Sequence, residues 1–358
     1  TEIGANSYSL EIAGKRLVLD SGMHPRYDGD AALPLLNLLP DDSVDAVLLS
    51  HAHQDHLGSL PVLMRRQPRA PVFMTEATRQ LSDVMLHNSV NVMGKRRDEG
   101  LGAPLFSHRE VDFAARRWAT VPIQQRFSLK GERLRPDEDS EVSIEFFDAG
   151  HILGSVGTMV RAEGRSVFYT GDVNFENQTI MRAARFPEEP LDVLIIETTR
   201  GDSPTPEEFT RAAEEKRFGE ALQAAFARGG SAMVPLFALG KTQEILAMIY
   251  QFRREGVIPE TPVYIGGLST KLTEIYDALA HHTPRQKHDL QLLESVNPFV
   301  LAGQEALTAQ LRPGRIYALS SGTMTEKTLS SSFARQVLSD PTQSLYFVGY
   351  ADPESPAG

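Results

Sequence analysis

The sequence lacks several features, and each absence excludes a class of protein. It contains no cysteine, so disulfides and thiolate metal sites are excluded and any metal must be held by His, Asp or Glu. It has no run of 18 or more apolar residues, which argues against a membrane-spanning helix. The N-terminus has no signal-peptide pattern, and we expect a cytoplasmic protein. Since it also lacks an initial methionine, we expect a few residues to precede it.

The sequence also has fewer basic residues than acidic residues. The formal net charge at pH 7 is −11, from 36 Lys and Arg against 47 Asp and Glu. An acidic surface opposes non-specific binding to nucleic acid, although a local basic groove stays compatible with this balance. Bound divalent cations would offset several of the acidic charges. The length of 358 residues and the apolar fraction of 41% are enough for two domains with a real core.

The chemistry is concentrated in one stretch that contains His51, His53, Asp55 and His56. Imidazole and carboxylate are the ligands that Zn²⁺ and similar divalent ions accept. The stretch follows an apolar run at 45–49, which predicts a buried strand. The four side chains would therefore lie at the C-terminal end of that strand, where α/β sheets usually place their sites. The alternation of ligands favours two metal ions over one.

Further polar residues follow other predicted strands. Asp20 ends the second strand of a hairpin predicted over residues 6–22, and His151 stands in a glycine-flanked stretch that allows the backbone to turn. Asp172 comes directly after Gly171 at the end of a strand, and Glu197 also follows a strand. These positions add candidates to the same kind of site.

The remaining patterns predict the elements that carry these residues. We expect a helix over 31–39, a helix over 76–91 and a mobile polar loop over 94–102. Residues 191–196 predict a buried strand. From about residue 200 strands and helices alternate, which predicts a second α/β domain with a parallel sheet.

The stretch from His51 to His56 resembles the HxHxDH signature of the metallo-β-lactamase fold, and Asp20, His151 and Asp172 fall in the order that this fold requires. Other blocks resemble the β-CASP branch of that fold, whose members process nucleic acids. These blocks are Ile195–Gly201, Val234–Leu246, Ser320–Met324 and Val348–Tyr350.

The resemblance implies an α/β fold in which a metallo-β-lactamase αββα sandwich carries an inserted parallel α/β β-CASP domain. We expect the first domain at 1–200, the β-CASP domain at 201–350, and the truncated start of a return to the first domain at 351–358. The family has two further histidines after the second domain, whereas this sequence has none after His288. We interpret that difference as an absent C-terminal return segment. His281, His282 and His288 are substitutes in principle only.

The resemblance also implies two Zn²⁺ ions. The implied metal ligands are His51, His53, Asp55, His56, His151 and Asp172. The three histidines at 51, 53 and 151 would hold one ion, Asp55 and His56 the other, and Asp172 would bridge both. Asp55, Asp172 and Glu197 are the implied catalytic residues, with Glu197 orienting a catalytic histidine of this branch. Asp20 is expected to orient a ligand-bearing loop from outside the ligand set.

Two residues of the second domain are candidates for substrate binding. Lys241 begins a predicted helix, where the N-terminus attracts anions, and Ser321 lies in one of the β-CASP blocks. A solvated lysine is the alternative reading of Lys241.

Together these features predict a di-zinc ribonuclease that hydrolyses single-stranded RNA in RNA processing or decay. Endonucleolytic cleavage is expected, with 5′-to-3′ exonucleolytic cleavage, a DNA preference and a homodimer left open. One alternative is a small-molecule metallo-hydrolase, against which the second domain argues. The other is a non-catalytic scaffold of an RNA-processing complex. The absent final histidines favour the scaffold, and the intact cluster at 51–56 opposes it.

Overall fold

The computed structural model describes residues 3–135, 137–199, 201–349, 351 and 353–358. Two residues of the β-CASP-like blocks described above, Arg200 in the block Ile195–Gly201 and Tyr350 at the end of the last block, lie outside this set. The chain divides into two compact units: unit 1 comprises Thr1–Asn177 and Arg182–Gly201, and unit 2 comprises Gln178–Met181 and Asp202–Gly358. The short segment that joins unit 2 early was not foreseen. The final residues group with unit 2, and their predicted return to the first domain stays a prediction.

The first sheet of unit 1 places the strand ends that matter for the site. In the described residues its order is β1-β2-β3-β4-β5. The strands are β1 (Tyr8–Ile12), β2 (Lys15–Leu19), β3 (Ala46–Leu48), β4 (Val72–Met74) and β5 (Trp118–Thr120). β1 and β2 form the predicted antiparallel hairpin, and β2 to β5 are parallel. The C-terminal ends of β2 and β3 therefore lie side by side, which brings Asp20 next to the 51–56 stretch.

The second sheet of unit 1 packs against the first. Its order in the described residues is β10-β9-β8-β7-β6, with β10 parallel to β9 and the other neighbours antiparallel. The strands are β6 (Phe127–Ser128), β7 (Ser143–Asp148), β8 (Val156–Ala162), β9 (Arg165–Tyr169) and β10 (Val193–Ile195). Leu19, Leu48 and Phe73 of the first sheet share one buried cluster with Phe127 and Phe146 of the second, so the core lies between the two sheets.

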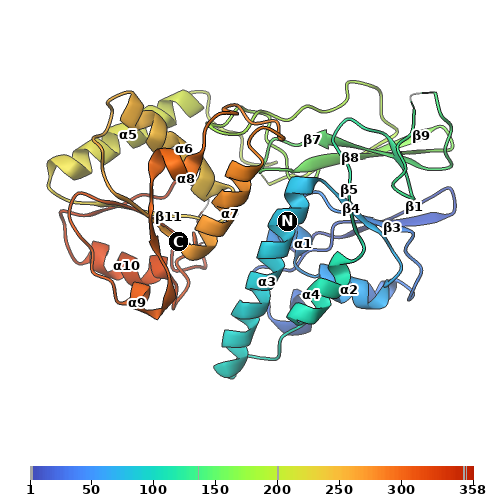
Figure 1. Ribbon diagram of the computed structural model, residues 1–358, viewed down its shortest axis with the longest axis horizontal. Helices are drawn as coiled ribbons and strands as arrows, with labels where there is room; N and C mark the ends of the chain where they lie inside the picture. Colours follow the sequence, from blue (N-terminus) through green and yellow to red (C-terminus); the bar gives the residue numbers. More distant parts are fainter. Residues whose placement is uncertain (1–2, 136, 200, 350, 352) are drawn as a thin grey trace. The chain divides into compact units, whose positions relative to one another are not determined.

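Helices cover the first sheet on its other side (Figure 1). They are α1 (Gln54–Leu57), α2 (Leu60–Arg66), α3 (Glu76–Asp98) and α4 (His108–Ala115). Thr75 caps α3 by accepting the N–H of Thr78 at 3.1 Å. These layers match the first three of the predicted αββα sandwich. From residue 116 to 201 no helix is assigned in the described residues, so the fourth layer stays a prediction.

Two predictions about local structure in unit 1 were wrong. The helix expected over 31–39 is replaced by two 3₁₀ turns, η1 (Gly29–Ala32) and η2 (Leu36–Leu38), because Pro34 lies between them and cannot continue a helix. The loop expected over 94–102 is helical to Asp98, since α3 continues through Gly94. Basic residues in the last turn of α3 favour its C-terminal dipole, and Arg96 forms a 2.5 Å ion pair with Asp28.

The strand expected to be buried at 191–196 is not buried. Val193 is 47% exposed, Leu194 is 52% exposed and Ile196 is 47% exposed. The reason is its place in the sheet, because β10 pairs only with β9 within the described residues and so forms an edge. An apolar run in the sequence does not distinguish a central strand from an edge strand.

Unit 2 has the predicted parallel sheet. In the described residues its order is β13-β12-β14-β11-β15, and every neighbouring pair is parallel. The strands are β11 (Ala232–Pro235), β12 (Val263–Gly266), β13 (Phe299–Leu301), β14 (Ile316–Leu319) and β15 (Ser344–Leu345). The parallel order confirms the α/β class of this part of the chain.

Helices flank this sheet, with α5 and α6 on one side and α9 and α10 on the other (Figure 1). They are α5 (Arg211–Ala227), α6 (Lys241–Arg254), α7 (Gly267–Ala278), α8 (Leu292–Val296), α9 (Gly303–Leu307) and α10 (Leu329–Leu338). The sequence patterns missed α8, β13 and α9, which are too short for a clear periodicity. Among the helices described in either unit, none combines the length and the apolar character needed to span a bilayer.

Candidate metal centre

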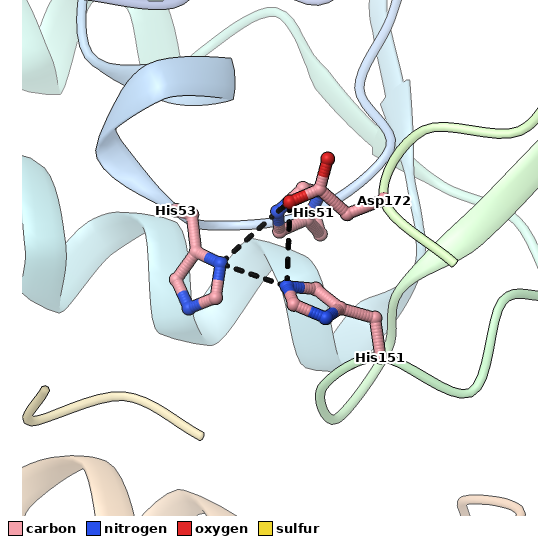
Figure 2. Close-up of side chains that lie close together, drawn as sticks. All are labelled: His51, His53, His151 and Asp172. Carbon is pink, nitrogen blue, oxygen red and sulfur yellow. Dashed lines mark hydrogen bonds and ion pairs between the residues drawn. The ribbon is translucent and has the colours of Figure 1, made fainter. Parts of the chain in front are cut away.

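Four of the predicted ligands in unit 1 converge on one point. The side-chain ligand atoms of His51, His53, His151 and Asp172 all lie within 4.8 Å of one another, and Figure 2 shows them facing each other. His53 Nδ1 is 3.2 Å from His51 Nε2 and 3.0 Å from His151 Nε2. Asp172 Oδ2 is 3.8 Å from His51 Nε2 and 3.6 Å from His151 Nε2. Such separations suit donors around one ion with bonds of about 2 Å.

A second group lies beside the first and shares Asp172. It consists of Asp55, His56 and Asp172. His56 Nε2 is 3.1 Å from Asp172 Oδ1 and 3.6 Å from Asp55 Oδ2. Asp172 thus directs Oδ2 to the first group and Oδ1 to the second, which is the geometry required of a bridging carboxylate.

Each ligand comes from a segment that follows a strand. His51 and His53 follow β3, and the short helix α1 begins after His53, whose carbonyl accepts the N–H groups of His56 at 3.0 Å and Leu57 at 2.9 Å. His151 follows β7, and Asp172 follows β9. The sheets therefore supply fixed ends from which the ligand-bearing segments reach the centre.

Gly171 allows the Asp172 segment to approach closely. Its φ is +54°, and a Cβ atom there would lie 2.8 Å from Cβ of Ser50. Any other residue would be strained by its backbone and would displace the neighbouring segment.

Asp20 is fully buried beside the centre and binds four groups. Its carboxylate accepts the N–H and the hydroxyl of Ser50, each at 2.7 Å, and the hydroxyl of Tyr169 at 2.7 Å. Its Oδ2 is also 2.7 Å from Nδ1 of His56. A carboxylate that accepts the Nδ1 proton of an imidazole directs its Nε2 towards the metal position. This geometry is what the predicted orienting role of Asp20 requires.

Burial and neighbouring charges shift the pKa values of the histidines. Burial lowers the pKa of His51 well below its ordinary value, and the charge of His56 adds to this effect. Burial would also lower the pKa of His56, but the charge of Asp20 and hydrogen bonds with Asp172 and Asp20 hold it well above the ordinary value. The two imidazoles therefore differ in proton affinity although they are neighbours.

The carboxylates differ as well. Burial would raise the pKa of Asp172, yet the hydrogen bond from His56 and the charges of three histidines hold it well below its usual range. Burial raises the pKa of Asp55, against the opposing charge of His56. Asp172 thus binds a proton more weakly than Asp55 does.

Glu197 lies next to the Asp172 segment but outside both ligand groups. Its carboxylate accepts the N–H of Val173 at 2.9 Å and that of Thr199 at 3.3 Å. It fixes the backbone adjacent to Asp172, and its predicted pairing with a catalytic histidine stays a prediction. Lys241 and Ser321 belong to unit 2, where burial lowers the pKa of Lys241. Their predicted contact with substrate also stays a prediction.

Several supporting residues were missed by the sequence patterns. Ser50 and Tyr169 bind Asp20, Asn6 places its Nδ2 at 3.0 Å from Nε2 of His56, and the Ser155 hydroxyl accepts the N–H of His151 at 3.2 Å. Ser50 and Ser155 stand directly beside recognised motifs, so proximity in sequence was a usable signal for them. Asn6 had no such signal, because a hairpin and a loop separate it from the 51–56 stretch.

The donor set fits divalent metal ions. One group offers three imidazole nitrogens and one carboxylate oxygen, and the other offers one imidazole and two carboxylates. Such mixed nitrogen and oxygen donors suit Zn²⁺ and neighbouring transition metals.

Comparisons with known proteins agree with this geometry. Residues 1–206 match the family model of the metallo-beta-lactamase superfamily, and residues 242–358 match that of the Beta-Casp domain. Ribonuclease TTHA0252 of Thermus thermophilus is 30% identical, with 98% of this chain and 77% of that protein covered.

Two eukaryotic proteins are similar over the same length of this chain. Cleavage and polyadenylation specificity factor 73 of Drosophila melanogaster is 28% identical, with 98% of this chain and 49% of that protein covered. Endoribonuclease ysh1 of Schizosaccharomyces pombe is 27% identical, with 98% and 44% covered. The chain therefore spans about half the length of these two relatives.

Proposed function

Because the chain belongs to the metallo-β-lactamase superfamily and carries a β-CASP domain, we propose that it is a metal-dependent ribonuclease that hydrolyses phosphodiester bonds in RNA. The observation that carries this proposal is the pair of ligand groups that share Asp172. The names of the relatives, a ribonuclease, an endoribonuclease and a cleavage factor, support the choice of RNA over other esters.

We further propose that the centre holds two Zn²⁺ ions. His51, His53 and His151 would hold one ion, Asp55 and His56 the other, and Asp172 both. Two such ions would supply Lewis-acid activation of water and neutralise charge on the phosphate.

The residues of the chain itself would fix the geometry of this centre. Asp20 accepts the Nδ1 proton of His56 and so turns Nε2 towards Asp55 and Asp172. Glu197 holds the N–H of Val173 and thereby limits the movement of Asp172. These contacts pre-organise donors that would otherwise reorganise when a phosphate enters.

We propose single-stranded RNA as the substrate and endonucleolytic cleavage as the main mode, with 5′-to-3′ exonucleolytic cleavage as a second mode. The support for the endonucleolytic mode is the name of the fission-yeast relative. An internally labelled circular RNA separates the two modes, since only an endonuclease cuts a chain without ends.

The test is a measurement of metal content together with an assay on single-stranded RNA, using the same sample. We expect about two zinc ions per chain, cleavage of RNA, loss of cleavage after treatment with a chelator, and recovery with Zn²⁺ or Mn²⁺. Single-stranded DNA and small carboxylic esters serve as competing substrates. Turnover of the esters with no cleavage of RNA would replace this proposal by a small-molecule hydrolase. A metal-loaded protein that turns over none of these substrates would favour a scaffold.

His53→Ala tests the centre itself. It removes a donor that lies close to both His51 and His151, so we expect the loss of one ion per chain and a fall in cleavage of more than about 100-fold. His87→Ala is the matched control, because His87 contacts His108 on α4 and lies outside both ligand groups. Equal loss in the two variants would contradict the assignment of the centre.

A further inference from the structure

The segment that follows Asp172 folds back on itself as a hairpin, here called the 174–184 hairpin. The N–H of Ala184 donates to the carbonyl of Asn174 at 2.8 Å, and the N–H of Gln178 donates to the carbonyl of Met181 at 2.9 Å. The tip, Gln178–Met181, groups with unit 2, whereas the arms on either side belong to unit 1. One short hairpin is thus anchored in both units.

The base of the hairpin contacts the segments that carry two metal ligands. The N–H of Asn174 donates to the carbonyl of Ala149 at 2.9 Å, and the N–H of Arg185 donates to the carbonyl of Asp148 at 2.9 Å. Asn174 lies two residues after Asp172. The base therefore ties the Asp172 segment to the loop that leads to His151.

Gly150 shows how closely the base fits. Its φ is +64°, and a Cβ atom there would lie 2.5 Å from the amide nitrogen of Ala184 and 2.7 Å from the carbonyl oxygen of Asn174. His151 is the next residue. A residue with a side chain would therefore not fit at this position, and the loop before His151 packs directly against the backbone of the hairpin base.

The tip is held within unit 2 by the carboxylate of Glu244 on α6. This carboxylate accepts the N–H of Thr179 at 2.7 Å and the N–H of Ile180 at 3.1 Å. Arg211, the first residue of α5, pairs with Glu244 and also donates to the Thr179 hydroxyl at 2.9 Å. Glu244 is only 4% exposed, so these hydrogen bonds to a charged group are protected from water.

A second element of unit 2 binds the tip through its backbone. The N–H of Gln286 donates to the carbonyl of Ile180 at 2.8 Å, and its side chain donates to the carbonyl of Gln178 at 2.8 Å. Met181 forms a β-bridge with Arg285. The tip is therefore bonded through both its N–H and its carbonyl groups, as a strand inside a sheet would be.

We propose that the 174–184 hairpin couples unit 2 to the metal centre, and that Glu244 is the positioning residue at its tip. The effect of this coupling on catalysis rests on the proposed function. Glu244 acts through the hairpin on the segments of His151 and Asp172. When the tip is held, those two donors are ordered for metal binding; when it is released, the base loosens and the donors lose their fixed separation.

Glu244→Gln tests the proposal with little change in size. The amide retains one oxygen acceptor, so one of the two N–H groups of the tip loses its partner, and Arg211 keeps only Glu215 of its two acidic partners. Asp277→Asn is the matched control. Asp277 is another carboxylate of unit 2 that accepts two consecutive N–H groups, and in the described residues these belong to Leu292 and Leu293 and not to the hairpin.

Hydrogen exchange of the metal-free full chain is the first measurement. In Glu244→Gln we expect about tenfold faster exchange at the tip and also at the base, in peptides that cover 148–151 and 172–174. Zn²⁺ affinity, measured by competition with a chromophoric chelator, should fall about tenfold. Asp277→Asn should change neither the exchange rate at the hairpin base nor the Zn²⁺ affinity. Both measurements are independent of RNA cleavage, so a wild-type protein without nuclease activity would refute the proposed function and leave this test intact.

A second variant keeps the contacts of the tip and those of the base, but lengthens the two arms of the hairpin between them. It carries one inserted glycine after Asn177 and one after Met181. We expect normal protection at the tip, looser exchange at the base, and no further effect of Glu244→Gln on the base in this background.

Two results would overturn the proposal. The first is faster exchange at the tip of Glu244→Gln with unchanged exchange at the base and unchanged Zn²⁺ affinity, which would make Glu244 a local anchor. The second is an equal effect of Asp277→Asn on the base, which would indicate general destabilisation. If the wild type cleaves RNA, the coupling also predicts that Glu244→Gln lowers kcat with little change in KM, because the donors are affected and the RNA-binding surface is not.

Discussion

Asp20 illustrates how one buried carboxylate can fix several positions of the centre at once. It accepts two hydrogen bonds from Ser50, which precedes His51, and one from His56. Its φ of +60° is uncommon for a residue with a side chain, and the four bonds to its carboxylate compensate for that conformation. The residue thus contributes both to ligand orientation and to stability.

Asp20→Asn should therefore weaken both properties. An amide cannot accept bonds at both ends, so at least one buried donor loses its partner. We expect a 10- to 100-fold loss of Zn²⁺ affinity and about 3 kcal/mol lower stability. Tyr169→Phe is the graded control, since it removes one of the four bonds and should cost about 1 kcal/mol. Chelator competition and chemical denaturation measure the two effects, and a variant with wild-type affinity would remove Asp20 from the orienting role.

Asp148 should make the stability of the folded state depend on pH with a sign opposite to that of most carboxylates. Burial raises its pKa from 3.8 to about 6, against the hydrogen bond from the Gly150 N–H and the charges of Arg185 and Arg182. Its Oδ2 has no hydrogen-bond partner in the described part of the chain. Because the folded state favours the neutral acid, the stabilisation is complete below about pH 4 and is lost as the pH rises through about 6.

Asp148→Asn should abolish that loss. Relative to wild type, the variant should gain roughly 2–3 kcal/mol of stability between pH 4 and pH 7. Urea denaturation of both proteins with excess chelator measures the difference, and other titrating groups cancel in the comparison. A difference that is flat with pH would show that Asp148 titrates normally.

At the scale of single residues, the sequence identifies the predicted metal ligands better than the residues that hold them in place. His51, His53, Asp55 and His56 are recognisable because four donors stand within six residues after an apolar run. Ser50, Tyr169 and Asn6 are ordinary polar residues whose role depends on which strands become neighbours. Neighbouring strands are set by the fold, so no local pattern could identify them.

Among the elements, β10 differs most from its prediction, because a buried strand was expected and its apolar side chains are exposed. Its apolar residues are exposed because one side of the strand has no neighbour in the described residues. An exposed apolar edge strand is a site for pairing with another chain. The prediction follows that the purified chain self-associates through this edge as its concentration rises.

Leu194→Lys should reduce that self-association several-fold while leaving metal content unchanged, since the side chain is half-exposed and outside the ligand groups. Leu338→Lys is the control, because Leu338 is 74% exposed and lies on a helix, α10, rather than on a strand. Light scattering over a concentration series distinguishes the two. An equal effect of both variants would point to general surface hydrophobicity.

Most elements were predictable where their periodicity is long. The hairpin of β1 and β2, the helix after Thr75 and the alternating elements of unit 2 were found, although α3 extends further than its pattern suggested. The errors at Pro34 and β10 have different causes. In the first case Pro34 interrupts the helix that the apolar pattern predicts. The second error depends on the order of strands in the sheet, which local sequence does not encode.

For the whole molecule, metal binding should govern stability as well as chemistry. The donors of unit 1 come from segments after β3, β7 and β9, so an ion joins parts that are far apart in sequence. A ligand that binds only the folded state stabilises it by about 2.7 kcal/mol when its concentration is 100 times Kd.

Saturating Zn²⁺ should therefore raise the midpoint of thermal unfolding by several degrees relative to chelator-treated protein. His53→Ala should lose most of this increase, whereas His87→Ala should keep it. Calorimetry at matched protein concentrations measures the midpoints. A wild-type midpoint that does not respond to Zn²⁺ would contradict metal binding at the centre.

The change in pattern near residue 200 predicts where a second domain begins, but no pattern predicts that Gln178–Met181 groups with unit 2. That segment joins unit 2 through the buried Glu244 and the backbone of Gln286, contacts that span more than sixty positions. No composition shift marks it in the sequence.

The parallel sheet of unit 2 also has a consequence for synthesis on the ribosome. β11 lies between β14 and β15, and Ala232 pairs with both Ile316 and Ser344. At about 5–20 residues per second, β11 emerges roughly 4 to 17 seconds before β14, the first of its two neighbours, is available. Its four residues, all buried in the finished sheet, are exposed throughout that interval. A nascent chain stalled after α6 should therefore bind chaperones more strongly than one stalled after β15.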